Sequence, residues 1–326
     1  MPIALSDEFH PDYAALTASA AVQVRSDYGV LLLAGPDRSA FLQRMTTNDI
    51  AALVPGQSAV TILTSDTARN RFAFTVVCRD EDFLLLPGPG EAAALAQELQ
   101  SKIFFMDKVT VANISAPVKR LRLMGPEADG ILAQAGVELT DTPDGGWQRA
   151  GELTVIKQFA YDVPGYVLLQ PAAGVDDLIR RLQTIGAHVL QRNEAYEARR
   201  IELGRPRPGA EIVNAYTPLE TGMAWVCAEN KGCYTGQEII ARQITYDKVT
   251  KYLVTLRSAE PLAPGASVTA GDKNAGAITS AAYSPALNAY LALAVLKRAY
   301  AEADAVVLVD GVTAQVIPPA EREAAT

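Results

Sequence analysis

The last quarter of the chain constrains the fold most, because its apolar segments are all short and closely spaced. Gly, Pro, Asn and Asp residues separate six strand-like runs, at 252–256, 267–270, 275–283, 289–296, 305–309 and 313–317. Strands of this length and spacing are typical of a small antiparallel barrel or sandwich. We therefore place a domain boundary near residue 248.

The region before this boundary mixes strand-like and helix-like periodicity and indicates an α+β fold. Strand-like segments lie at 29–33, 59–63, 71–77, 83–86, 109–114, 154–161 and 165–169. Helix-like segments lie at 36–45, 91–102, 175–185 and 193–203.

Two of these units resemble each other. Residues 30–37 and 121–127 each contain a strand-like run, a Gly-Pro pair and an acidic residue, and each precedes a helix-like segment. The two Gly-Pro pairs are 90 residues apart. This internal similarity reflects either a duplication or a coincidence between two common strand–turn–helix units.

Charge and hydropathy exclude several classes of function. The 326 residues carry a net charge of −8 and a pI near 5.0, whereas a nucleic-acid-binding face is basic. The N-terminus has no basic stretch followed by an apolar run, and no run of about 18 apolar residues occurs. We therefore expect a cytoplasmic protein that binds neither nucleic acid nor membrane.

The three cysteines, Cys78, Cys227 and Cys233, form no Cys-x-x-Cys pair and are odd in number. Disulfide frameworks use even sets of cysteines, and only two histidines are available to complete a zinc site. We therefore expect no metal site. An iron–sulfur cluster held by the three thiolates and a fourth ligand is the alternative.

The densest group of chemically useful residues is the octapeptide 231–238, which reads K-G-C-Y-T-G-Q-E. Thr235 and Glu238 have the spacing of a capping box, which predicts that a short helix starts here. Cys233 would then precede a helix N-terminus, where free amides and the helix dipole stabilise a thiolate. Lys231 would favour the thiolate further if its ammonium group turns toward the sulfur.

The two glycines of the octapeptide, Gly232 and Gly236, permit positive φ and allow an anion or a flat ring to approach the loop closely. A purely structural turn with a buried cysteine is the alternative, since capping boxes are common. We favour the functional interpretation, in which Cys233 and Lys231 are the catalytic residues and Cys233 is the working thiol.

The octapeptide resembles the signature of YgfZ-type folate-binding proteins, which are related to the T-protein (aminomethyltransferase) of the glycine cleavage system. Further segments resemble the same family, and together they cover most of the chain. They are residues 35–37, 41–43, 46–49, 107–109, 200–202, 209–212, 217–223 and 239–242.

This resemblance implies an α+β, three-domain ring around a central folate pocket. Two intertwined domains would occupy residues 1–247, and a C-terminal antiparallel β-barrel would occupy residues 248–326. The resemblance also implies tetrahydrofolate or a related reduced folate as cofactor. It further implies a role in assembly or repair of iron–sulfur proteins, so that iron–sulfur clients or assembly proteins would be the partners.

By position, Glu202 corresponds to the family carboxylate expected near the pterin, where it can accept hydrogen bonds from N–H groups. Asn48 either lines the pocket or closes a loop, and Tyr234 either stacks on the pterin or packs in the protein. Arg242 either meets the glutamate tail or pairs with Glu238. The expected folate-binding residues are Asn48, Glu202, Lys231, Gly232, Cys233, Tyr234, Gly236, Gln237, Glu238 and Arg242.

One segment departs from the family pattern. Residues 64–71 lack the usual glycine, and only Asp66 stands where the T-protein is thought to use paired carboxylates. Aminomethyl transfer needs a group that manages the amine proton, so folate binding is better indicated than this reaction. A folate-dependent aminomethyl or methyl transferase is therefore one alternative function, and a non-catalytic scaffold whose barrel recruits a protein is another.

Overall fold

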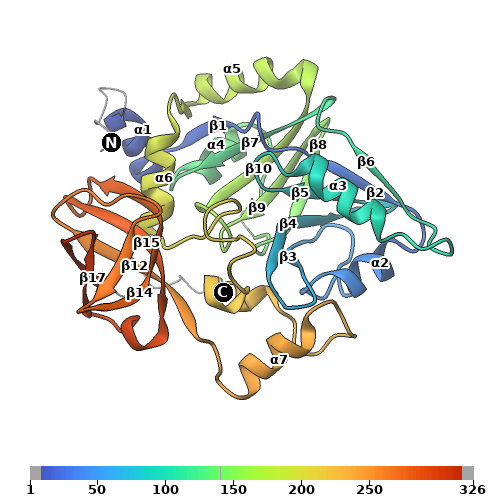
Figure 1. Cartoon of the computed structure of the whole chain (residues 1–326). Helices are drawn as coiled ribbons and strands as arrows, with labels where there is room; N and C mark the ends of the chain where they lie inside the picture. The colour runs from blue at the N-terminus through green and yellow to red at the C-terminus, as the bar shows by residue number, and fades with distance from the viewer. Residues whose placement is uncertain (1–8, 140, 318–326) are drawn as a thin grey trace.

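The computed structural model describes residues 9–139 and 141–317 (Figure 1). Its helices are α1 (Phe9–Ala18), α2 (Arg38–Met45), α3 (Ala92–Ser101), α4 (Ala128–Gln134), α5 (Val175–Ile185), α6 (Asn193–Glu202) and α7 (Gln237–Thr245). Its strands are β1 (Ala21–Val24), β2 (Leu31–Ala34), β3 (Ser58–Thr64), β4 (Asn70–Cys78), β5 (Asp82–Pro87), β6 (Thr110–Asn113), β7 (Val118–Met124), β8 (Trp147–Ala150), β9 (Leu153–Gln158), β10 (Gly165–Pro171), β11 (His188–Val189), β12 (Lys251–Ser258), β13 (Ser267–Ala270), β14 (Lys273–Ser284), β15 (Ala289–Lys297), β16 (Val306–Val309) and β17 (Val312–Ile317). Within these described ranges, no helix is both long and apolar enough to cross a bilayer.

Two sheets pack face to face in the first part of the chain. The first has the order β3-β4-β5-β2-β6, and the second has the order β11-β1-β7-β10-β9-β8. A cluster of buried side chains joins their inner faces, with Val77 and Leu84 from the first sheet and Ile156 and Val167 from the second. Helices α2 and α3 pack on the outer face of the first sheet, and α4 and α5 on that of the second. Because both faces are covered, β5 and β10 are nearly continuous apolar runs.

The sequence similarity between the two Gly-Pro units has a structural counterpart. Gly35 and Gly125 both follow a strand and precede a helix, with φ of 112° and 107°. A Cβ at these positions would lie 2.0 Å and 2.5 Å from backbone carbonyl oxygens, so only glycine fits without movement of the main chain. The strand order β3-β4-β5-β2 of the first sheet also matches β8-β9-β10-β7 of the second. Shared turn geometry and shared order favour duplication over coincidence.

Strands β12 to β17 close an antiparallel barrel in the order β12-β15-β14-β13-β16-β17. All six predicted strands are present, and the barrel alternative is confirmed over the sandwich. Small and branched residues such as Val268, Ala292 and Ala294 fill the interior. In Figure 1 the barrel lies beside α6 and apart from the two stacked sheets.

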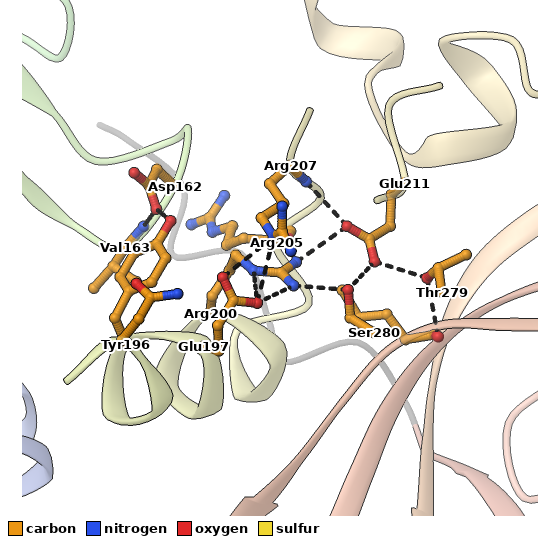
Figure 2. Close-up of polar contacts among 12 residues, drawn as sticks. Asp162, Val163, Tyr196, Glu197, Arg200, Arg205, Arg207, Glu211, Thr279 and Ser280 are labelled. Carbon is orange, nitrogen blue, oxygen red and sulfur yellow. Dashed lines mark hydrogen bonds and ion pairs between the residues drawn. The ribbon is translucent and has the colours of Figure 1, made fainter. Parts of the chain in front are cut away.

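A buried ionic network ties α6 to the barrel (Figure 2). Arg200 is fully buried and donates to Glu197 Oε2 at 2.7 Å and to Glu211 Oε2 at 3.1 Å. It also donates to Ser280 Oγ on β14 at 2.8 Å. Ser280 and Thr279 donate in turn to Glu211 Oε1, at 2.5 Å and 2.7 Å. Glu211 is itself fully buried, so each of the two charges depends on the other.

We predict that Arg200→Met destabilises the protein by about 3–5 kcal/mol, because the Glu211 carboxylate would stay buried without its cation. Arg199→Met is the matched control: Arg199 is partly exposed and pairs with Glu202, so its loss should cost at most about 1 kcal/mol. Chemical denaturation followed by circular dichroism measures both. Equally small losses would show that the network does not hold the barrel in place.

Candidate functional site

A cleft of about 170 Å³ lies where the two sheets meet the chain that follows α6. Asn48 and Thr75 contribute to its wall from the first sheet and its connections. Gln158 and Tyr161 contribute from the end of β9 and the following turn, and Trp225 from a short 3-10 turn. Three separate parts of the chain therefore build one cleft.

Two buried polar atoms of this wall have no hydrogen-bond partner among the described residues. They are Thr75 Oγ1 and Gln158 Oε1. Gln158 Nε2 donates to Tyr161 O at 3.0 Å, and this bond fixes the orientation of the amide. Buried polar groups in proteins are nearly always paired, so these two atoms mark a polar part of the cleft wall with unused hydrogen-bonding capacity.

Lys231 fastens the octapeptide to the wall of the cleft. Its Nζ donates to Thr46 O and Asn48 O, both at 2.6 Å. Burial lowers the pKa of Lys231 to about 8, while Asp49 and Cys227 act in the opposite direction. Within the described residues no hydrogen bond joins Lys231 to Cys233, so the ammonium group serves the Thr46–Asn48 backbone rather than the expected thiol.

The two cysteines of the segment after α6 have different surroundings. Cys233 is exposed, whereas Cys227 is buried. Burial raises the pKa of Cys227 to about 12, although Thr47 and Lys231 lower it. Cys227 is therefore a neutral packing residue, and Cys233 is the accessible thiol of this loop.

The predicted capping box is wrong. Helix α7 begins at Gln237, its N-cap residue is Gly236 with φ 83°, and no side chain caps it. Gln237 Oε1 instead accepts from Tyr234 N at 3.3 Å, and Thr235 O accepts from Thr64 Oγ1 at 2.6 Å. The left-handed conformation of Gly236 places Thr235 outside the first helical turn, so its hydroxyl cannot serve as the cap.

Asn48 lines the cleft and also closes its own loop, while its contact with folate stays a prediction. Its Nδ2 donates to Val60 O at 2.8 Å. Its Oδ1 accepts from Asp49 N, also at 2.8 Å. Tyr234 is buried and packs in a cluster with Ile62 and other apolar residues.

Glu202 lies away from this cleft wall, at the contact between α1, α6 and the barrel. Its Oε1 accepts from Tyr13 at 2.7 Å and from Ser284 at 2.6 Å, and its Oε2 accepts from Arg199 at 3.1 Å. Through these bonds the Glu202 carboxylate joins α1, α6 and the barrel. Its assignment as a pterin contact stays a prediction.

Two other octapeptide positions lie on the surface, and Gln237 is half-buried. Gly232 and Glu238 are exposed, as is Arg242 one turn further along α7. Within residues 9–139 and 141–317, no ion pair forms between Glu238 and Arg242. Their roles in ligand binding stay predictions as well.

Sequence reasoning missed Thr75, Gln158, Tyr161 and Trp225. A usable signal existed for the first two: Thr75 interrupts the apolar run 72–78 of β4, and Gln158 is a buried polar residue at the end of β9. A polar residue at a buried strand position must be satisfied by something, and this requirement marks it as a site candidate.

A larger cavity of about 530 Å³ lies between α3 and the octapeptide loop. The charged residues of its wall are Arg44, Asp66, Arg71, Glu98 and Lys102. Arg71 pairs with Glu98 and Arg44 with Asp107, so most of these charges are already compensated. The smaller cleft is the better candidate site because its buried polar atoms are unpaired.

Two family profiles together match most of the chain. The GCVT N-terminal domain matches residues 5–231, and the glycine cleavage T-protein C-terminal barrel domain matches residues 251–320. The chain therefore belongs to the GcvT, or aminomethyltransferase-like, family.

Individual relatives agree with this assignment. A chloroplastic protein of Arabidopsis thaliana, named provisionally as a transferase, is 30% identical over 260 residues, which are 78% of this chain and 60% of the relative. The chain thus spans less than two thirds of that relative. The aminomethyltransferase of Listeria monocytogenes is 26% identical over 287 residues, covering 85% of this chain and 78% of the relative.

A solved structure shows the same fold. The glycine cleavage system aminomethyltransferase T of Bartonella henselae superposes with a TM-score of 0.86 at 20% identity. The match covers 95% of this chain and 89% of that protein. The predicted T-protein-like fold with a C-terminal antiparallel barrel is confirmed.

We predict that Gly236→Ala disturbs the octapeptide loop and lowers stability. A Cβ at Gly236 would lie 2.6 Å from Ser65 O and 3.0 Å from Ala68 Cα. The left-handed conformation alone costs alanine about 1 kcal/mol, and these backbone contacts add to that cost. Gly232→Ala is the matched control, because its Cβ would meet no atom within 4 Å. Thermal unfolding compares the two, and an equal Tm for both variants would contradict this loop geometry.

Proposed function

We propose that the protein binds tetrahydrofolate or a related reduced folate in the cleft beside Tyr161. We further propose that it acts in assembly or repair of iron–sulfur proteins, as a YgfZ-type member of its family. The observation that carries the folate site is the pair of unpartnered buried atoms, Thr75 Oγ1 and Gln158 Oε1, in one cleft.

The chemistry of the wall fits a pterin. A pterin is flat and carries N–H donors and a carbonyl acceptor, and Gln158 Oε1 can accept from such a donor while the Thr75 hydroxyl can donate or accept. Tyr161 and Trp225 offer aromatic surface beside a flat ring. The cleft suits the pterin rather than the whole folate, so the glutamate tail would extend beyond it.

Aminomethyl transfer has less support than folate binding. Asp144 lines the cleft, but its two carboxylate oxygens accept from Phe159 N at 2.7 Å and Ala160 N at 2.9 Å. A carboxylate engaged in this way is a poor group for managing an amine proton. Asp66 lies at the larger cavity instead.

The role of Cys233 rests on the octapeptide resemblance and on its exposure. An exposed thiol on a loop can meet a client protein directly, which a buried thiol such as Cys227 cannot. Lys231 would act as a positioning residue that holds this loop on the cleft wall.

We predict that tetrahydrofolate quenches the fluorescence of Trp225, which lines the cleft with 40% of its surface exposed. The other tryptophan, Trp147, donates to Cys78 O at 3.0 Å inside the fold. The quench should therefore survive in Trp147→Phe and vanish in Trp225→Phe.

Gln158→Leu should weaken binding about tenfold, since it removes one hydrogen bond to the ligand. Neither quench nor thermal stabilisation at millimolar tetrahydrofolate would overturn the folate site.

We predict that Cys233→Ser fails to restore iron–sulfur enzyme activity in cells that lack this protein. Cys78→Ser is the control, because Cys78 is buried in the first sheet and should restore activity. Enzyme assays of the clients measure both, and immunoblots check that the variants accumulate equally. Full restoration by Cys233→Ser would remove the thiol from the proposal while leaving folate binding intact.

A further inference from the structure

Three arginines of the second sheet gather in the interior around one carboxylate. One directly follows β1, and the other two belong to β7. Arg25, Arg120 and Arg122 are only 5%, 4% and 1% exposed. The carboxylate is that of Asp162, which follows β9 and has φ 72°. Three buried guanidinium groups against one carboxylate leave an excess of two positive charges among these four residues.

Asp162 cannot satisfy all three arginines. Its Oδ1 accepts from Tyr196 at 2.5 Å and from Val163 N at 2.7 Å. Its Oδ2 lies 3.7 Å from Arg25 Nη2 and 3.9 Å from Arg122 Nε, beyond hydrogen-bond distance. Figure 2 shows Asp162 directed toward Tyr196.

Several N–H groups of the arginines consequently have no acceptor within the described residues. They are Arg25 Nε and Nη2, Arg120 Nε, and Arg122 Nε and Nη1. Gln23 Oε1, on the strand paired with Arg122, is also unpaired and can serve one of them at most. Burial lowers the pKa of Arg120 to about 10, so its guanidinium group is still charged at neutral pH.

A small cavity borders this cluster. It has a volume of about 20 Å³, and its wall includes Tyr28, Arg120, Tyr161, Asp162 and Tyr196. This space accommodates a group of about the size of a water molecule or one carboxylate end. Planar guanidinium N–H groups pair bidentately with carboxylates and with phosphates, and the small volume of this cavity favours the smaller, planar carboxylate.

We propose that this cavity is a binding site for a carboxylate anion, held by Arg120 with Arg25 and Arg122 compensating its charge. The carboxylate can come from a free small acid. It can also come from the glutamate end of a folate in the neighbouring cleft, since Tyr161 lines both spaces. The first source does not depend on the proposed folate function.

The test is calorimetric and thermal titration of the whole chain with formate and acetate at constant ionic strength, with chloride and phosphate as comparisons. We expect a rise in Tm and saturable heat with formate and acetate only. Arg120→Met should lower the affinity for formate at least about tenfold while remaining folded, because methionine fills a similar volume without a buried charge. Arg149→Met, at an exposed position of the same sheet, should leave the affinity unchanged.

Two further arms separate the sources of the carboxylate. Competition with formate by tetrahydrofolate but not by tetrahydropteroate, which lacks the glutamate, would identify the folate tail as the ligand. Formate binding that neither compound disturbs would identify a free small acid. Equal stabilisation by chloride or phosphate, no response to formate, or an unchanged response in Arg120→Met would each overturn the proposal.

Discussion

The buried pair Arg200–Glu211 is the interaction on which the arrangement of the site depends. Both side chains are fully buried, and Ser280 of the barrel bonds to each of them. Removing such charges from water is costly unless each is met by the other and by further hydrogen bonds. The network therefore fixes the barrel, α6 and residue 211 in one geometry. The chain that follows residue 211 carries Trp225 and the octapeptide loop, so this contact fixes where that segment starts, and Lys231 anchors it further along.

The cleft is a product of that arrangement rather than of any one domain. The two sheets bury their inner apolar faces against each other, and the polar positions Thr75 and Gln158 lie near the end of this contact. The segment after α6 then covers them with Trp225. Lys231 completes the junction, since its ammonium group binds backbone carbonyls at residues 46 and 48. A polar ligand at this junction would contact all three parts of the chain.

Local signals in the sequence were sufficient for much of the fold. The helix ending at Gly186 and the six barrel strands follow from periodicity and turn residues alone. Strands β1 and β11 escaped prediction because they are short and depend on pairing with each other and with β7. The capping box failed because the φ of Gly236, a consequence of packing against residues 64–68, decides where α7 begins. The octapeptide was visible from sequence, but the convergence of Thr75 with Gln158 depends on sheet packing and was not.

The two buried arginine clusters described here differ in whether carboxylates within hydrogen-bond distance compensate the charge. Arg200 meets two carboxylates, a hydroxyl and a backbone carbonyl, so its charge is compensated within the protein. Arg120 is as deeply buried but donates to Pro87 O and leaves its Nε without an acceptor. Well-packed apolar residues would serve stability at least as well as an ion that stacks over Tyr28 but has no carboxylate at hydrogen-bond distance. A ligand that supplies a negative charge would explain why Arg120 is buried beside a cavity with an N–H group that has no acceptor.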